Sequence, residues 1–282
     1  MAYKHYQVLG IGVAFSPNLT ANLYEAARLS KMLKAELVLV HVGPESEEKK
    51  QQIDQIIHAQ GEPPVTYRLV FKVGKPVGAI VEAVKENGID LLLLGALKEE
   101  RFVKYYLGSI ARKITKAASC SVLLMINPSL ERVACQHVVV NGFEDEHTAD
   151  TIHAAFHVAN SLGSKQLTIV EEIASEEVSI RVEDDRSLRR LNLLKEKIKR
   201  KQELRVQKII ENLPDEVKQH TVIKTQPIFG KRGYSIGHYA QIVRADLLVM
   251  NAPNTYRFSE RFFPHDVEYI LNELPTDVLL VR

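Results

Sequence analysis

An internal repeat constrains the fold more than any other feature of this sequence. Residues 74–126 align with residues 230–282 without a gap at a shift of 156, and 13 of the 53 aligned positions are identical. The identities include Asp90 with Asp246 and the apolar residues that follow each of them. Most of them fall on apolar segments that we expect to be strands and on buried positions of expected helices. Two copies of one fold explain this pattern most simply, and 282 residues are enough for two domains.

The first copy alternates short apolar segments with amphipathic ones. Continuous apolar runs such as Leu37–Val42 are typical of strands that are covered on both faces of a parallel sheet. Apolar residues at helical spacing after residue 22 and after residue 76 predict helices between the strands. The expected strands are 8–15, 37–42, 65–73, 90–95 and 121–126, and two further expected helices are 49–59 and 110–118. Alternation with right-handed crossovers predicts an open sheet with helices on both faces.

The second copy repeats this order. We therefore predict an α/β fold with two tandem doubly wound five-stranded parallel sheets. The expected domains are 1–128 and 133–282, and the polar segment Asn127–Arg132, which contains a proline, is the expected linker. The second domain carries a longer second helix, roughly residues 185–213.

Composition narrows the class of protein. Lys and Arg number 37 and Asp and Glu number 35, so the formal net charge of +2 does not indicate a nucleic-acid binder. There is no run of 18 apolar residues, so we expect no membrane span, and no signal core, so we expect a cytoplasmic protein. The two cysteines, Cys120 and Cys135, are too few for a disulfide framework, and we expect two reduced, half-buried thiols.

The loop after the expected fourth strand is the best candidate for a ligand site. Ligands of open parallel sheets bind at the carboxyl ends of the strands, where the strand order reverses. Here Gly95 follows the fourth strand directly, and Gly108 and Ser109 begin the next helix. A glycine after a strand allows a phosphate to approach closely, and a helix N-terminus attracts an anion. The alternative is a tight turn followed by an ordinary helix cap.

Three phrases of the first copy carry a family resemblance. They are Asp90–Gly95 (DLLLLG), the Gly-Lys-Pro turn at 74–76 and the closing segment 120–126 (CSVLLMI). With this order of elements, the chain resembles the universal stress protein family, and the duplication resembles its tandem type. The resemblance implies the adenine nucleotide alpha hydrolase-like fold, with strand order 3-2-1-4-5 in each half. It also implies that the two halves form an internal pseudo-dimer, edge to edge through their last strands.

The resemblance also implies a nucleotide site. Some members of the family bind ATP through Gly-x2-Gly-x9-Gly-(Ser/Thr) and an Asp that ends the first strand. The middle glycine is Lys98 here, whose ammonium could reach a phosphate, and the Asp position is Ala14. By resemblance we expect ATP or another adenine nucleotide, with Mg as a companion. The residues expected to bind it are Ala14, Val42, Gly43, Gly95, Lys98, Gly108 and Ser109.

The second half departs further from this pattern. The corresponding positions are Asn251, Asn254, Pro264 and His265, so no glycine remains. Asparagine tolerates left-handed backbone conformations, but a proline donates no N–H to a phosphate. We interpret this half as having lost the nucleotide loop, and a different ligand there is an alternative.

Three histidines are further candidates. His153 and His157 are four residues apart on an expected helix, a spacing that can hold a metal. No third ligand is visible, and we therefore expect solvated or capping histidines rather than a zinc site. His41 lies on the second expected strand near the adenine side of the crevice, and we expect a hydrogen-bonded strand residue rather than a ligand contact.

The long helix of the second half is strongly basic. Residues 186–208 contain ten Lys or Arg and only two acids, Glu196 and Glu203. A charged run of this kind usually faces water. The alternative is a patch for an acidic partner or nucleic acid, although the aromatic residues that stack on bases are missing.

The function that we expect is that of a non-enzymatic stress-response protein. No serine or cysteine stands beside a recognisable base, and there is no Gly-x4-Gly-Lys-(Ser/Thr) loop. The nucleotide would act by shifting a conformational population that a protein partner reads. An interaction scaffold with vestigial sites and a weak ATP hydrolase are the alternatives, and a homodimer is an alternative assembly.

Overall fold

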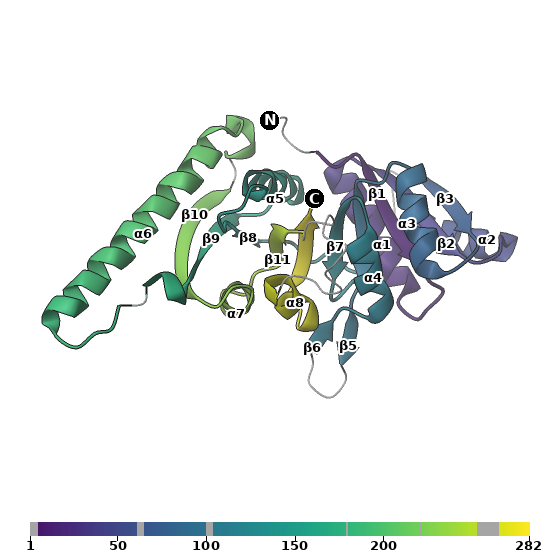
Figure 1. Cartoon of the computed structure of the whole chain (residues 1–282). Helices are drawn as coiled ribbons and strands as arrows, with labels where there is room; N and C mark the ends of the chain where they lie inside the picture. The colour runs from purple at the N-terminus through teal and green to yellow at the C-terminus, as the bar shows by residue number, and fades with distance from the viewer. Residues whose placement is uncertain (1–4, 61–64, 100–103, 179, 220, 253–264) are drawn as a thin grey trace.

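Ten strands form one continuous sheet that runs through both halves of the chain (Figure 1). The computed structural model describes residues 5–60, 65–99, 104–178, 180–219, 221–252 and 265–282. Ten strands pair in the order β10-β9-β8-β11-β12-β7-β4-β1-β2-β3. The strands are β1 (Val8–Val13), β2 (Glu36–Val42), β3 (Tyr67–Lys72), β4 (Leu91–Gly95), β5 (Leu97–Glu99), β6 (Lys104–Tyr106), β7 (Ser121–Met125), β8 (His137–Asn141), β9 (Gln166–Ala174), β10 (Val222–Gly230), β11 (Leu247–Asn251) and β12 (Asp277–Val281). The helices are α1 (Leu19–Leu33), α2 (Glu47–His58), α3 (Pro76–Glu86), α4 (Ser109–Ala117), α5 (Thr148–Leu162), α6 (Asp185–Glu211), α7 (Tyr234–Ile242) and α8 (His265–Asn272), with short 3-10 turns η1 (Ser175–Val178) and η2 (Asp215–Val217).

Each half of the sheet has the predicted strand order. Within each half all five strands are parallel, and the order 3-2-1-4-5 is β3-β2-β1-β4-β7 in the first half and β10-β9-β8-β11-β12 in the second. The two halves meet where β7 pairs with β12 in antiparallel fashion, with Leu123 opposite Leu279. We call this pair the central seam.

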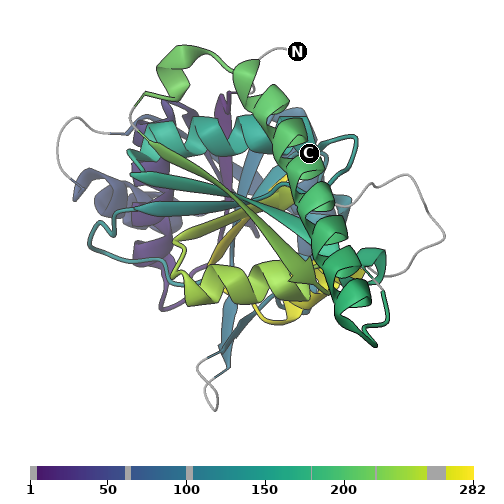
Figure 2. The ribbon, with the colours of Figure 1, turned by 90° about the vertical axis from the view of Figure 1, so that its left-hand side faces the viewer.

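Helices cover both faces of the sheet. The buried residues of α1, α2, α5 and α6 belong to one apolar layer, and those of α3, α4, α7 and α8 belong to the other. Figure 2 shows this arrangement in the second half, where α5 and α7 lie on opposite sides of the strands. The four leucines of β4 alternate between the layers, so Leu91 and Leu93 face one and Leu92 and Leu94 face the other. This double burial explains the continuous apolar character of the strand.

The repeated aspartate at the start of the fourth strand has a structural role in both halves. The Asp90 carboxylate accepts the N–H groups of Gln7 and Val8 at 2.8 and 3.1 Å. Asp246 likewise accepts the N–H groups of Gln136 and His137 at 2.7 and 2.9 Å. Each carboxylate thus bonds the backbone where the neighbouring first strand begins, which fixes the register of the two strands.

The segment after β4 is a hairpin, not the loop that we expected. β5 and β6 pair antiparallel, with Leu97 opposite Tyr106 and Lys98 opposite Tyr105. Strands of three residues are too short to give a recognisable alternation in the sequence. We call these two paired strands, residues 97–99 and 104–106, the β5–β6 hairpin.

The β5–β6 hairpin contacts the second half of the chain. The Leu274 N–H donates to the Tyr105 carbonyl at 2.8 Å, and the Leu107 N–H donates to the Leu271 carbonyl at 3.0 Å. Arg112 of α4 adds an ion pair with Glu268 of α8. The segment between β4 and α4 therefore connects the two halves.

The basic helix α6 crosses the outer strands of the second half (Figure 2). Most of its side chains are exposed, and Gln202 and Val206 are its buried ones. Arg205 turns inward and donates to the Gly142 carbonyl. Among the described residues, no helix is both long enough and apolar enough to cross a membrane.

Candidate functional site

The carboxyl ends of β1, β2 and β4 lie together at one edge of the first half, because these strands are parallel neighbours. Ala14, Gly43 and Gly95 follow or end these three strands, and Gly108 and Ser109 begin α4 beyond the hairpin. The side chains of Ala14, Lys98 and Ser109 and the surface of Gly95 are exposed, whereas Val42, Gly43 and Gly108 are half-buried. We call this edge the first crevice.

Gly95 lies next to an unused buried acceptor. A Cβ atom at Gly95 would meet only Asn22 Oδ1 of α1, 3.9 Å away, among the described atoms within 4 Å. This Asn22 oxygen is buried and has no hydrogen-bond partner among the described residues. A buried acceptor without a donor is costly, so a donor group of a ligand would be stabilised here.

The N-terminus of α4 offers unpaired donors beside this space. Its cap residue, Gly108, is extended and supplies no side-chain hydrogen bond, and the first-turn N–H groups of Ser109, Ile110 and Ala111 have no partner in the described part of the chain. Such a helix end attracts anions. The approach over Gly108 is narrowed by Leu97, because a Cβ atom at Gly108 would lie 2.8 Å from Leu97 Cδ1.

Lys98 does not point at the helix end. Its ammonium lies 5.9 Å from the centre of the Tyr105 ring, the residue opposite it in the hairpin. The side chain that replaces the middle glycine of the nucleotide pattern thus packs on the β5–β6 hairpin.

Aromatic and basic side chains cover the ends of β1 and β2. His41 is buried, and its Nδ1 lies 2.9 Å from the Val13 carbonyl, which confirms the expected hydrogen-bonded strand residue. Lys49 Nζ lies 2.9 Å from His41 Nε2 and 5.3 Å from the centre of the Phe15 ring. The Phe15 ring meets His41 edge-on at 5.0 Å and is 36% exposed. The Gly43 N–H already donates to the Lys72 carbonyl at 2.8 Å, so it is not available to a ligand.

The residues around Gly95 and Gly108 therefore fit a phosphate and a hydrogen-bond donor of a ligand. Gly95 leaves room, Asn22 supplies an unused acceptor and α4 supplies unused donors. At the opposite end, an adenine base would meet the side chains of Phe15, His41 and Lys49 rather than bare backbone. The sequence pattern did not include Asn22, Phe15 or Lys49, because they lie outside the glycine motif and only the fold brings them to it.

The second half differs at the matching edge. The Asn251 amide donates to Asp145 at 3.0 Å and accepts from the Thr151 hydroxyl, so this side chain fixes the loop after β8. His265 begins α8. Asn254 and Pro264, which belonged to the degenerate pattern, lie outside the described residues.

His153 and His157 are not solvated or capping residues as we expected. Both face inward from α5, with 7% and 6% of their surfaces exposed. Burial lowers the pKa of His153 and, with the nearby His5, lowers the pKa of His157 to about 4, so both are neutral at pH 7. Helix α5 is buried on several sides by the sheet, α1 and α6, which the helical spacing alone does not reveal. No group of three metal-ligating side chains occurs within the described ranges.

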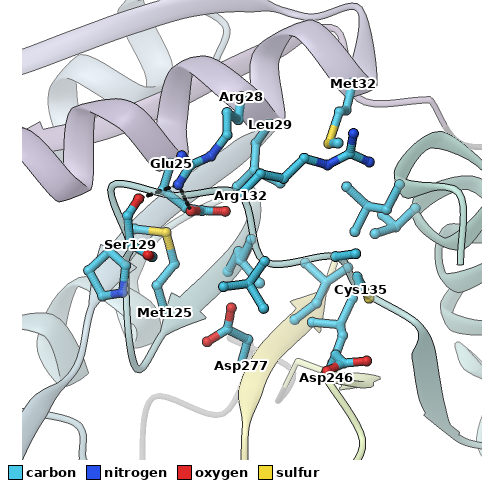
Figure 3. Close-up of a pocket in the computed structure, with 18 of the residues that line it drawn as sticks. Glu25, Arg28, Leu29, Met32, Met125, Ser129, Arg132, Cys135, Asp246 and Asp277 are labelled. Carbon is cyan, nitrogen blue, oxygen red and sulfur yellow. Dashed lines mark hydrogen bonds and ion pairs between the residues drawn. The ribbon is translucent and has the colours of Figure 1, made fainter. Parts of the chain in front are cut away.

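A cavity of about 230 Å³ lies between the two halves, beside the central seam (Figure 3). Helix α1 borders one side, β7 and β12 form the floor, and the linker after β7 passes over it. Arg28 of α1 holds the linker by donating to the Ser129 and Leu130 carbonyls. Asp277 lies on the floor, and burial raises the pKa of its carboxyl to about 7.

The two cysteines are free thiols. Cys120 is buried and Cys135, which borders this cavity, is half-buried. Burial raises the pKa of each thiol to about 12. Because the thiolate is the reactive form, both are poor nucleophiles at neutral pH.

Comparisons with known proteins agree with this architecture. Residues 43–125 match the universal stress protein family. The universal stress protein YxiE of Bacillus subtilis is 25% identical over 126 residues, which cover 36% of this chain and 85% of YxiE. A universal stress protein from Archaeoglobus fulgidus aligns with a TM-score of 0.67 at 16% identity, over 98% of each chain. A universal stress protein solved in complex with cAMP aligns with 45% of this chain and all of its own, at 22% identity and a TM-score of 0.35.

These matches show that the first half of the chain is similar to universal stress proteins. The likeness to the Archaeoglobus fulgidus structure extends over both halves and shows the same α/β fold, with a large, mostly parallel sheet.

Proposed function

We propose that this chain is a tandem universal stress protein, a non-enzymatic and cytoplasmic stress-response protein whose first crevice binds an adenine nucleotide. One observation carries the proposal. The unpartnered Asn22 oxygen lies beside Gly95, and the unpaired first turn of α4 begins after Gly108, which packs against Leu97 of the hairpin. A ribose hydroxyl can donate to the Asn22 oxygen, and a phosphate can accept from the N–H groups of α4.

Different residues of the chain would bind different parts of the nucleotide. Gly108 and Ser109 would offer backbone N–H groups and a hydroxyl to phosphates, with Mg as a companion of the bound nucleotide. Asn22 would accept from a donor on the ligand. Phe15 and Lys49 would face the base.

The β5–β6 hairpin gives a bound nucleotide a route to the second half. Leu97 lies over Gly108. Tyr105 of the same hairpin bonds to Leu274, and the adjacent Leu107 bonds to Leu271. A nucleotide that displaces Leu97 would change the population of hairpin positions, and a protein partner that contacts the hairpin would read this change.

Gly95→Val is expected to weaken adenine-nucleotide binding by roughly tenfold or more, or about 1.4 kcal/mol per factor of ten. The valine side chain fills the space beside Asn22, and the new Cβ meets nothing closer than 3.9 Å, so the strand stays intact. Titration calorimetry with Mg-ATP and with AMP measures the effect, after any bound nucleotide has been removed and identified by mass spectrometry.

Gly78→Val is the matched control, because a Cβ atom at Gly78 on α3 meets nothing within 4 Å and the residue lies outside the first crevice. It should bind nucleotide as the unchanged protein does. Equal affinities of the Gly95 and Gly78 variants would show that the nucleotide binds elsewhere, and absence of binding by the unchanged protein at millimolar ATP would overturn the nucleotide proposal. A phosphate-release assay on the same samples tests the non-enzymatic part, since steady turnover would indicate a hydrolase.

An interaction scaffold is the second candidate function. The packing of Leu97 over Gly108 and of Lys98 against Tyr105 favours it, because both contacts hold the hairpin without a ligand. Under this alternative, nucleotide leaves hydrogen exchange of the hairpin unchanged.

A further inference from the structure

A separate pocket of about 160 Å³ lies at the carboxyl ends of β8 and β9, in the second half. Helix α6 borders it with Gln202 and Arg205, and η1 borders it with Glu177. This is the edge of the sheet where the second half has lost the glycine pattern. Four glutamates and two arginines line the pocket, so acids outnumber bases.

Glu171 is the exceptional group of this pocket. Only 1% of its surface is exposed, and both of its carboxyl oxygens are buried without a hydrogen-bond partner among the described residues. The next residue, Glu172, is also buried but accepts the N–H groups of Gly233 and Ile236 at 2.9 and 3.1 Å. Because side chains alternate along a strand, Glu172 points to the face that α7 covers. Glu171 points to the opposite face, where no described residue donates to it.

The remaining charged groups in the depth of the pocket already have partners. Arg205 donates to the Gly142 carbonyl and to Gln202, and Glu144 accepts from Gln202 at 3.2 Å. Arg232 lies 3.7 Å above the centre of the Phe143 ring. The described residues thus supply no donor to Glu171, although they bond to Arg205 and Glu144 beside it.

We propose that this pocket binds a small organic cation, a molecule with a primary amine or a guanidine whose N–H groups donate to Glu171. A buried carboxyl without a donor costs free energy that a charged donor would recover. Glutamates at the entrance repel an anionic nucleotide. The described residues contain no group of three ligands placed for a metal ion, which favours an organic cation over a metal.

The proposal predicts that binding releases a proton. Burial raises the pKa of Glu171 to about 7, Arg205 of α6 lowers it and Glu203 of α6 raises it. A bound cation stabilises the carboxylate, so affinity should increase as the pH rises toward 7 and level off above it. The other charged groups that line the pocket are Glu144 in the loop after β8, Glu172 of β9, Glu177 of η1 and Arg232 before α7.

Calorimetric titration of the full chain with agmatine, putrescine and AMP tests the proposal at pH 6 and pH 8. We expect agmatine or putrescine to bind more tightly at pH 8 by up to about tenfold, with proton release at pH 6 that is visible as a dependence of the heat on the buffer. Glu171→Gln keeps the shape, removes the charge and should abolish amine binding and the proton release together.

Glu211→Gln, which removes an exposed acid at the end of α6, is the matched control and should leave amine affinity unchanged. Weak amine binding that both variants lose equally would be surface attraction and would overturn the proposal. So would the absence of amine binding, which would mean a water-filled pocket, or preferential binding of AMP that Glu171→Gln strengthens. None of these results depends on the first crevice, because Gly95→Val should leave amine binding intact.

Discussion

Leu279→Ala is expected to lower the free energy of unfolding of the chain by about 2–5 kcal/mol and to destabilise both halves together. Leu279 is 1% exposed on β12, and it lies opposite Leu123 of β7 across the central seam. The alanine would leave a cavity between strands that belong to different halves. Because each half covers the other's last strand, the loss of packing should reach both.

Leu193→Ala provides a matched control, because Leu193 of α6 is 71% exposed. Its expected effect lies within about 0.5 kcal/mol. Urea unfolding followed by circular dichroism gives the free energies, and hydrogen exchange gives the stability of each half. If Leu279→Ala weakened protection only after residue 136, the halves would unfold independently and the seam would not couple them.

The fold was predictable because the repeat falls on residues that the sheet buries. Four consecutive leucines in β4 face two core layers alternately, and the aspartate before them bonds the neighbouring strand. Both features leave local traces in the sequence. The β5–β6 hairpin leaves none, since its strands have three residues each and its contacts are with Leu271 and Leu274, far along the chain.

The candidate sites were predictable only where one segment carries the signal. Gly108 and Ser109 are adjacent in the sequence, so the sequence alone located the N-terminus of α4. Asn22, on α1, precedes Gly95 by more than seventy residues, and nothing in the neighbouring sequence marks it as a site residue. The same holds for Glu171, whose missing donor becomes evident only when the side chains of α6 and the loop after β8 are in place. His153 and His157 likewise required the packing of α5 to show that they are buried.

Asp277→Asn is expected to stabilise the protein at pH 8 by about 1–4 kcal/mol and to have little effect at pH 4. Asp277 lies on the floor of the cavity between the halves (Figure 3). Its Oδ1 accepts the Ile126 N–H at 2.8 Å. Burial, and to a smaller extent the charges of Glu25 and Asp246, raise the pKa of this carboxyl from its ordinary 3.8 to about 7. Asparagine keeps the acceptor for Ile126 and removes the ionisation.

The direction of the pH effect on stability follows from the number of protons that the folded and the unfolded chain bind. Between about pH 4 and pH 7 the folded chain keeps the Asp277 proton while the unfolded chain releases it, so stability falls as the pH rises through this range. Above about pH 7 the folded state carries a half-buried carboxylate on the cavity floor, and a cost of about 4 kcal/mol is the upper limit of what asparagine recovers. The seam strand β12 would then be more stable without its acid than with it.

Thermal unfolding from pH 4 to pH 8 checks this, with Glu131→Gln as the control, an exposed acid in the linker above the same cavity. The difference between Asp277→Asn and the unchanged protein should grow with pH and stop growing above about pH 7, while the control should follow the unchanged protein throughout. A constant difference would mean that the substitution acts through packing, and a destabilised variant at pH 8 would mean that the carboxylate has a stabilising partner when charged. In either case the cavity floor would be polar and hydrated, and the two halves would be held by the apolar contacts of the seam, such as Leu123 with Leu279, rather than by a neutral Asp277.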